Sequence, residues 1–420
     1  MKSKFQIPRG TMDYLPDYFK KWKAIETIWR KLTYTYGFSE IQTPIFEHTE
    51  LFIRTAGETS DIVSKELYTF EDRGGRSLSL RPEGTSPVVR AYLESGMQAL
   101  PQPVKLFYLM PMFRYERPQA GRLRQHTQYG VEAIGSASSF TDAEVINLIM
   151  SFYKKLGFQG LKIQLNSLGD NATRAAYRAK LIEYFDQYTG DFTEEYKMKL
   201  QKNPLRILDT KEPGMKEMVE NAPKIIDFLS NESKTRFEEL QAYLQEFDIP
   251  FAINHRLVRG LDYYNDTVFE VTSEKLGAQD AIAGGGRYDT LIDQFGGKDT
   301  PAFGFGGGME RLIFAMEKHE IQLPAPANLK AYVIAADDSA KQQAINILMR
   351  LRSQDISCDA DPSFDTKLKR QLGRASKLAA EYAVIIGQDE MANNYFTLKN
   401  LFEETQVKLS LDELITRLKG

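Results

Sequence analysis

An arginine and two adjacent tyrosines stand close together in the run Leu257–Tyr264, where Asp262 is the only other polar side chain. Arginine supplies a positive charge that persists at every physiological pH. Tyrosine supplies a rigid wall that ends in a hydroxyl group. Together, Arg259, Tyr263 and Tyr264 could form part of a polar binding site. The same run taken alone could also be the end of a strand followed by a turn.

A second candidate is a pair of predicted strands, Leu106–Glu116 and Leu123–Gly135, joined by the turn Arg117–Arg122. Because strand side chains alternate between two faces, the residues that share a face follow from their parity. One face would carry polar side chains from both strands, namely Arg114, Glu116, Gln128 and Glu132. A solvated face of an antiparallel sheet is the alternative. The mixture of acids, an amide and a glycine, beside a basic loop that could close over phosphates, favours a binding floor instead.

A third candidate is the glycine-rich run Gly304–Gly308, followed by a predicted amphipathic helix over Met309–His319. Glycine weakens a strand, so alternate glycines predict a surface that another group approaches closely. That group could be a flat adenine ring or a neighbouring strand. Arg311 falls in the first turn of the helix, where a cation is mildly disfavoured, which indicates an anion nearby. No Walker-A pattern occurs in the sequence, so a P-loop nucleotide site is not the competing interpretation.

These segments resemble a known family. Phe113–Pro118 is similar to motif 2 of the class II aminoacyl-tRNA synthetases, and Gly304–Arg311 is similar to motif 3. Arg259–Tyr264 resembles the signature peculiar to the histidyl-tRNA synthetases within that class. The resemblance covers nearly the whole chain, starting at Pro8–Thr11. It implies a histidine–tRNA ligase that activates histidine with ATP and then transfers it to the 3′ end of its tRNA.

The resemblance also implies roles for charged residues. Arg114 would clamp the ATP α-phosphate and the amino-acid carboxylate, and Arg259 would face the α-phosphate from the opposite side; these two are the expected catalytic residues. Arg311 would bind the γ-phosphate and Glu116 would contact the adenine side. ATP is then a substrate, and Mg²⁺ is expected to accompany its triphosphate.

The expected histidine pocket takes residues from four segments. Arg81–Thr85 resembles the family's loop for the substrate α-amino group, and the pocket would comprise Glu83, Thr85, Gln128, Glu132, Tyr263, Tyr264 and Tyr288. Hydrogen bonds to the imidazole would supply specificity, since a wrong substrate leaves polar groups unpaired. Alternatively, Glu83 could be a helix cap and the tyrosines could be core residues. One departure is His126-Thr127-Gln128, where the family commonly has an aromatic residue followed by His.

Further resemblances concern tRNA and assembly. Arg117 and Arg122 would face ATP or the tRNA acceptor end, and Lys369 and Arg370 match the family's anticodon-binding domain. A solvated basic helix face is the alternative for the latter pair. The segment Tyr36–Thr55 stands where the family has motif 1, which implies a homodimer.

Composition limits the remaining possibilities. The chain has 420 residues, a net charge of −3, one cysteine and four scattered histidines. It is therefore not a generic polyanion binder, forms no internal disulfide and offers no structural metal spacing. No stretch reads as a membrane span or secretory signal, so we expect a cytoplasmic protein.

The elements that must position these residues fall in three zones, and the resemblance implies an α+β fold for the chain. We expect a catalytic domain over residues 1–322 with an antiparallel sheet flanked by helices, and a helical insertion at about 172–250 within it. A Pro/Ala linker over 323–328 precedes a C-terminal α/β domain over 329–420, predicted as strand, helix, strand, helix, strand.

Several elements are predicted by local patterns within these zones. Apolar residues at helical spacing predict a helix over Trp22–Tyr36, and a short strand is expected to follow over Ile41–Phe46. In the insertion, candidate helices cover residues 174–188, 193–202 and 231–247.

Two rival functions fit part of this pattern. A non-catalytic paralogue that regulates a partner enzyme typically lacks the Arg259–Tyr264 segment or the C-terminal domain. A class II ligase for another amino acid should lack the double tyrosine. This chain keeps all three features.

Overall fold

A computed structural model gives the fold of the chain, and it describes residues 5–57, 60, 62–117, 121–208, 210, 212–277, 280–323, 329–363 and 367–419. The chain forms two compact units, residues 1–323 and 324–420. Apart from Leu323, the predicted linker lies outside the described residues. Among the described residues, no helix combines the length and the hydropathy that crossing a membrane requires.

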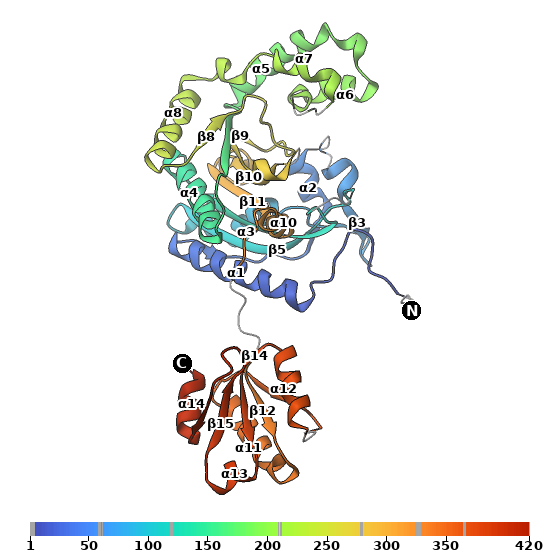
Figure 1. Cartoon of the computed structure of the whole chain (residues 1–420). Coiled ribbons are helices and arrows are strands. Elements are labelled where there is room, and N and C mark those ends of the chain that lie inside the picture. The colour runs from blue at the N-terminus through green and yellow to red at the C-terminus, as the bar shows by residue number, and fades with distance from the viewer. Residues whose placement is uncertain are drawn as a thin grey trace. The chain divides into compact units, whose positions relative to one another are not determined.

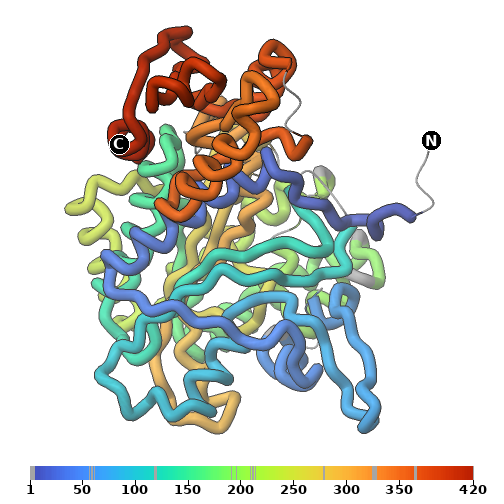
Figure 2. The backbone as a smooth tube through the Cα atoms, turned by 90° about the horizontal axis from the view of Figure 1, so that it is seen from below, coloured from blue at the N-terminus to red at the C-terminus, as the bar shows by residue number. Residues whose placement is uncertain are grey.

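The described residues of unit 1 form an eight-stranded sheet (Figure 1). Its strands in spatial order are β1 (Ser39–Glu40), β5 (Val104–Phe113), β6 (Gln125–Ile134), β11 (Ala302–Gly308), β10 (Ala281–Arg287), β9 (Asn265–Thr272), β7 (Lys162–Ser167) and β8 (Phe251–Ile253). The inner neighbours pair antiparallel, and only the outer pairs β1–β5 and β7–β8 are parallel. Figure 2 shows β5 and β6 side by side as two long strands. The predicted α+β class is confirmed.

One face of this sheet is sealed by helices. Four of them pack their apolar sides onto it: α1 (Pro16–Thr35), α4 (Ser139–Leu156), α8 (Asn231–Glu246) and α10 (Met309–Lys318). In α1 the buried residues Trp22, Ile25, Trp29 and Leu32 recur at helical spacing, which explains why that stripe faces the sheet. The strands contribute Tyr129, Val131 and Ala133 to the same core, as the parity argument predicted.

The opposite face carries α3 (Thr85–Glu94), α9 (Leu291–Gln294) and a second core. Gln128, Gly130 and Glu132 point to this side. Glu132 has no exposed surface, so the alternative of a solvated sheet face is wrong. Neighbouring segments, rather than solvent, cover the polar floor at Glu132.

A small sheet with order β2-β4-β3 flanks unit 1, formed by β2 (Phe46–His48), β4 (Ser77–Leu80) and β3 (Tyr68–Glu71), next to α2 (Thr49–Ala56). The prediction of a strand over Ile41–Phe46 is wrong, because residues between Glu40 and Phe46 leave the sheets. The buried guanidinium of Arg81 takes the carbonyls of Thr43 (2.7 Å) and Pro44 (3.0 Å) that a neighbouring strand would otherwise bind.

Strand β5 ends at Phe113, three residues before the predicted end. The Arg114 amide still donates to the Arg124 carbonyl at 2.8 Å, but the Tyr115 amide donates to the Glu66 carbonyl at 2.8 Å. The chain therefore turns away from β6 after Arg114, and the pairing stops there.

Between β7 and β8 lies a run of helices, residues 171–246, which we call the insertion. It contains α5 (Asn171–Asp186), α6 (Glu194–Lys202), α7 (Lys216–Glu220) and α8. The helices predicted over 174–188, 193–202 and 231–247 are confirmed as α5, α6 and α8. Figure 1 shows α5, α6 and α7 grouped at one end of unit 1.

Unit 2 is a five-stranded sheet with helices on both faces. The strand order is β13 (Cys358–Ala360), β12 (Leu329–Ala335), β14 (Ala380–Ile386), β15 (Phe396–Asn400) and β16 (Gln406–Leu409), with helices α11 (Lys341–Arg352), α12 (Leu368–Lys377), α13 (Gln388–Ala392) and α14 (Leu411–Lys419). The predicted alternation of strands and helices is confirmed through β14. Strands β15 and β16 were not predicted; β16 is only four residues long and largely exposed.

Candidate active site

A cleft opens on the polar face of β6, β10 and β11, on the side of the sheet that α1 and α4 leave free. Its walls come from segments far apart in the sequence. Among the described residues they include Glu83, Thr85, Arg114, Glu116, Arg122, His126, Gln128, Arg259, Tyr263, Tyr264, Glu270, Gly284, Gly306, Gly307, Gly308 and Arg311. Cationic, anionic and hydroxyl-bearing side chains thus face a common space.

The cations are held at fixed positions around this cleft. The guanidinium of Arg114 donates from Nε to the Pro82 carbonyl at 2.8 Å. Arg311 donates from Nε to the Ala281 carbonyl at 3.3 Å, and burial together with the nearby Arg122 lowers the pKa of its guanidinium. Four arginines line the described part of the cleft, so it is suited to a ligand with several negative charges.

Arg259 is ion-paired with Glu270 of β9. Burial alone would lower the pKa of Arg259, but the Glu270 carboxylate and the neighbouring tyrosines raise it above its usual value. Its guanidinium lies on Gly284 of β10, where an added methyl group would overlap it. The glycine thus lets an arginine from a loop lie flat against the sheet.

Two of the histidine-pocket candidates, Thr85 and Tyr288, are hydrogen-bonded to a third, Glu132. This buried carboxylate accepts from the hydroxyls of Thr85 (2.8 Å), Tyr108 (3.2 Å) and Tyr288 (2.5 Å). Burial raises the pKa of Glu132 to about 8, although the bonds from Tyr288 and Thr85 oppose the shift. A carboxyl group in such surroundings can carry a proton near neutral pH.

Tyr263 and Tyr264 stand above this cluster. Their ring centroids are 4.6 Å apart, and Tyr263 packs edge-on against Tyr288 at 5.8 Å. Tyr263 and Tyr264 line the cleft, whereas Glu132 and Tyr288 do not appear among the described residues of its wall. The last two therefore lie behind the surface of the cleft.

Two other residues that line the cleft, Gln128 and Glu83, differ in their hydrogen bonding. The buried Oε1 of Gln128 accepts no hydrogen bond from any described residue. Glu83 accepts from the backbone amides of Thr85 (2.6 Å) and Ser86 (2.9 Å), so it caps α3, as its alternative interpretation predicted. Because Glu83 also lines the cleft, the cap holds a carboxylate at the rim of the site.

The interpretation of the glycine strand as a closely packed strand is confirmed, and the interpretation as an adenine surface stays a prediction. A methyl group on Gly304 would overlap the Glu132 carboxylate, and one on Gly306 would overlap the Gln128 amide. Close packing of the neighbouring strand therefore explains these two positions. Gly306, Gly307 and Gly308 also line the cleft, so the same strand presents a surface free of side chains to a ligand.

Comparison with known proteins identifies the family of the chain that carries this cleft. The family model described as histidyl-tRNA synthetase matches residues 10–312, and the model described as anticodon binding domain matches residues 330–420. The histidine–tRNA ligase of Anoxybacillus flavithermus is 49% identical over 99% of both chains. The chain belongs to the histidyl-tRNA synthetase family.

Other members agree over the full length. The histidine–tRNA ligase of Geobacillus sp. is 48% identical over 99% of both chains. The apo histidyl-tRNA synthetase of S. aureus is 38% identical and has a TM-score of 0.84, covering 99% of this chain and 100% of its own. A protein described as ATP phosphoribosyltransferase regulatory subunit/histidyl-tRNA synthetase from Bacillus halodurans shares the fold, with 22% identity and a TM-score of 0.65 over 92% of this chain and 99% of its own. The family expected from the sequence is thus confirmed, and with it the enzyme class, an aminoacyl-tRNA ligase that uses ATP.

For a member of this family, the structure brings most of the predicted site residues to one cleft. Arg122 lines it, with its side chain 47% exposed and Nη1 at 3.9 Å from Glu116. Arg117 is exposed and does not line the described part of the cleft. Pro118–Ala120 of the basic loop lie outside the described residues. Lys369 and Arg370 are exposed on α12 in unit 2.

Several residues in and around the cleft were not predicted. Tyr108 and Glu270 bind predicted residues directly, and their parity within β5 and β9 could have indicated them. His126 stood out in the sequence only as a departure from the family pattern; burial and then Arg114 lower its pKa to about 3, so it is neutral. Glu310 accepts from the Thr127 amide at 2.9 Å and from the Tyr14 hydroxyl, joining β6 to α10; no local sequence signal pointed to that pairing.

Proposed function

We propose that the chain is a histidine–tRNA ligase that forms histidyl-adenylate and pyrophosphate from histidine and ATP, and then transfers histidine to the 3′ end of its tRNA. One observation carries the proposal most strongly. In the described cleft, four arginines meet a cluster of tyrosines around a buried carboxylate, on a single face of the sheet. Such a site can hold a polyanion and a small polar ring side by side.

Activation brings two anions together, the histidine carboxylate and the ATP α-phosphate. Fixed cations relieve their repulsion without reorganising during the reaction. Arg114 and Arg259 are the proposed catalytic residues for this step, and both line the cleft. Their anchoring to Pro82 and Glu270 supports the proposal, because anchored charges are already oriented when the substrates arrive.

Recognition of histidine is proposed for the tyrosine cluster and its neighbours. Tyr264 and Tyr263 would form the wall, Gln128 would use its open acceptor, and Glu83 with Thr85 would take the α-amino group. Glu132 and Tyr288 would act from behind. Glu132 can either keep or release a proton near neutral pH, which suits a partner that donates or accepts through an imidazole.

ATP is proposed to lie along the glycine surface of β11, with its adenine side near Glu116 and its γ-phosphate near Arg311. Mg²⁺ would accompany the triphosphate and neutralise part of its charge. No structural metal is proposed.

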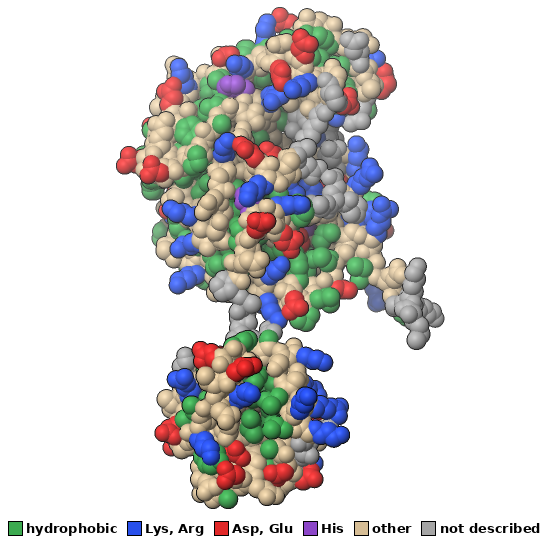
Figure 3. Space-filling view, viewed as in Figure 1, with side chains coloured by type: hydrophobic (Ala, Val, Ile, Leu, Met, Phe, Trp, Pro, Cys, Tyr) green, Lys and Arg blue, Asp and Glu red, His purple; other side chains and the backbone are tan. Residues whose placement is uncertain are grey.

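The remaining proposals concern the whole protein. Residues 1–322 would be the catalytic domain, with the insertion at about 172–250 and a linker at 323–328, and residues 329–420 would be the anticodon-binding domain. Arg117 and Arg122 would meet the acceptor end of the tRNA. Lys369 and Arg370 would meet its anticodon arm; Figure 3 shows Lys and Arg side chains gathered along the edge of unit 2 that carries α12 in Figure 1. We propose the cytoplasm as its location.

A homodimer is also proposed. In and next to the segment that resembles motif 1, Ile45 and Phe46 are 43% and 51% exposed, and Phe70 of the same small sheet is 42% exposed. Apolar side chains gathered on one surface often mark a protein interface.

The proposed function is tested by amino-acid-dependent exchange of pyrophosphate into ATP, run with each of the twenty amino acids. Exchange with histidine alone is expected. Exchange with another amino acid would change the substrate, and silence from folded protein that still binds histidine would favour a regulatory, non-catalytic relative.

A further inference from the structure

The segment that carries Arg259, Tyr263 and Tyr264 has no regular secondary structure. It connects β8, which ends at Ile253, to β9, which begins at Asn265. A strand is held by its ladder of backbone hydrogen bonds, but a connecting segment needs other contacts to keep its side chains in place. Asn166 of β7 binds the His255 and Leu257 carbonyls, and Glu270 of β9 pairs with Arg259. Three further contacts, at or near the tyrosines, come from the insertion.

The first contact is at Asp262, between the arginine and the tyrosines. Its Oδ1 accepts from Nη2 of Arg206 at 2.9 Å and from Nδ2 of Asn203 at 3.1 Å. The side chains of Arg206 and Asp262 are 16% and 29% exposed, so this ion pair is partly withdrawn from water. Charged pairs in such surroundings are less screened than those on an open surface.

The second contact is at Tyr264 itself. Nη1 of Arg174 in α5 donates to the Tyr264 carbonyl at 3.0 Å. The backbone at the tyrosine that lines the cleft is therefore tied to the first helix of the insertion.

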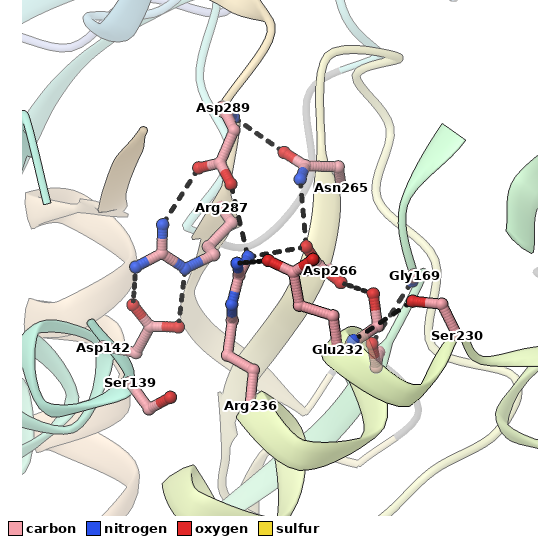
Figure 4. Close-up of polar contacts among 12 residues, drawn as sticks. Ser139, Asp142, Gly169, Ser230, Glu232, Arg236, Asn265, Asp266, Arg287 and Asp289 are labelled. Carbon is pink, nitrogen blue, oxygen red and sulfur yellow. Dashed lines mark hydrogen bonds and ion pairs between the residues drawn. The ribbon is translucent and has the colours of Figure 1, made fainter. Parts of the chain in front are cut away.

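The third contact is at Asp266 in β9, where Figure 4 shows Arg236 reaching from α8. Asp266 accepts from Nη1 of Arg236 at 2.9 Å and from the Ser233 hydroxyl at 2.6 Å. Its φ of 42° lies in the left-handed region, which side-chain-bearing residues rarely adopt, so these bonds stabilise an otherwise disfavoured backbone.

Arg236 also contacts the segment that carries Tyr288. Nη1 of Arg236 lies 3.5 Å from Asp289, which is paired with the fully buried Arg287 at 2.9 Å (Figure 4). Arg287 is in turn paired with Asp142 of α4 at 2.8 Å. Arg287 and Asp289 are the sequence neighbours of Tyr288. This network therefore holds the backbone on both sides of the tyrosine whose hydroxyl binds Glu132.

We propose that the insertion is a positioning device for the active site: Arg206, Arg174 and Arg236 hold residues 262, 264 and 266, and thereby place Arg259 and the two tyrosines against the cleft. The inference rests on the proposed function, which it deepens. None of the three arginines is among the described residues that line the cleft, so they act through the segment they hold. By linkage, a ligand that moves the insertion changes the affinity of the cleft, and a ligand in the cleft changes the affinity of the insertion.

The test compares Arg206→Ala with a matched control, Arg178→Ala. Arg178 lies one turn after Arg174 in α5, and its Nη2 donates to the Gln201 carbonyl, a bond made wholly inside the insertion. Pyrophosphate exchange would give kcat and the KM for histidine and for ATP, and a thermal melt would check folding. We expect Arg206→Ala to lower kcat/KM for histidine about tenfold or more, and Arg178→Ala to stay within about twofold of wild type. Arg206→Lys, which keeps the charge, should recover part of the activity.

Hydrogen exchange of the peptide covering residues 257–266 supplies a readout that does not depend on activity. Arg206→Ala should speed exchange there and leave the β5–β6 strands unchanged. The double variant Arg206→Ala/Asp262→Ala should be no less active than the worse single variant, because both substitutions remove the same ion pair. If Arg206→Ala does not fold, Asn203→Ala replaces it in every measurement.

Wild-type exchange rates in residues 257–266 together with unchanged histidine activation would overturn the proposal, as would an equal decrease in Arg178→Ala or additive decreases in the double variant. Failure of the proposed function looks different. Wild-type protein would then show no histidine-dependent pyrophosphate exchange, while the hydrogen-exchange comparison would still decide whether Arg206 holds the segment.

Discussion

At the scale of single residues, the cleft is an arrangement of charges that are anchored before any substrate binds. Arg114 is tied to a backbone carbonyl and Arg259 to Glu270. Glu132 is held by three hydroxyls in a site without exposed surface. Each of these residues has a different consequence when it is changed.

Arg259→Ala should reduce the rate of histidine activation by roughly 10²–10³, the usual effect of removing one group that stabilises charge in a transition state. Histidine affinity should fall far less, since the arginine is proposed to face the phosphate. Pyrophosphate exchange and equilibrium histidine binding would measure the two effects. A parallel collapse of affinity would instead make Arg259 a binding residue.

The raised pKa of the buried Glu132 carboxyl predicts that the stability of the protein depends on pH. Its pKa in the folded protein is about 8, above the 4.5 of an unperturbed glutamate, so the folded state holds a proton that the unfolded state releases. The contribution is fully present below pH 4.5 and is lost as the pH rises through about 8. Glu132→Gln should therefore flatten the fall in Tm between about pH 5 and 9, by about 2–4 °C for each kcal/mol of linked free energy.

Melting curves of Glu132→Gln across that range would check this, with Glu94→Gln as the control. The Glu94 side chain is 71% exposed, and its replacement should leave the pH dependence unchanged. Identical slopes in wild type and Glu132→Gln would contradict a proton on Glu132.

At the scale of elements, the polar floor depends on two neighbouring strands, β6 and β11, that contribute different kinds of residue. β6 supplies the long side chains of Gln128 and Glu132, and β11 supplies glycines opposite them. The register pairs Gly304 with Glu132 and Gly306 with Gly130, and the Gln128 side-chain amide lies over Gly306. A side chain on either glycine would have to displace a functional group.

Gly304→Ala should accordingly destabilise the protein by about 1–3 kcal/mol, the usual cost of overpacking a filled interior. It should also reduce histidine activation, since the Glu132 carboxylate must move. Urea denaturation and pyrophosphate exchange would measure both effects. Gly190→Ala is the control because a methyl group there meets nothing within 4 Å, and equal stability of the two variants would contradict this account of the strand.

The elements were predictable where one local pattern decided them. Apolar residues at Ile25, Ile28, Trp29 and Leu32 predicted α1, and the parity of β6 predicted which of its side chains share the polar face. The predicted strand over residues 41–46 was wrong because Arg81, far along the chain, takes its carbonyls. A distant partner of that kind leaves no trace in the local sequence.

At the scale of the whole molecule, the two units have separate cores, so their functions should be separable. Residues Lys369, Arg370, Arg374 and Lys377 are exposed on α12, whereas Gln371 and Ala375 are buried. The basic side of this helix is therefore directed to solvent, where an RNA backbone could bind.

The double reversal Lys369→Glu/Arg370→Glu should weaken tRNA binding by about tenfold or more and reduce its salt dependence by roughly one unit of slope for each phosphate that is no longer neutralised. Histidine activation should be unchanged. Filter binding at several salt concentrations and pyrophosphate exchange would separate the two. Lys341→Glu on α11 is the control, and an equal decrease of both activities in the double variant would indicate damage to the fold.

The sequence by itself determined the family, the fold class and most of the residues that meet in the cleft, because these depend on residue type, short spacing and strand parity. It indicated Arg259, Tyr263 and Tyr264 without indicating what holds them. Only the tertiary structure decided that Glu132 and Tyr288 lie behind the wall, that Glu83 caps a helix while it lines the site, and that Arg206, Arg174 and Arg236 hold the signature segment. Those facts depend on pairings between residues far apart in the chain, and burial, hydrogen bonding and charge pairing are properties of neighbours in space.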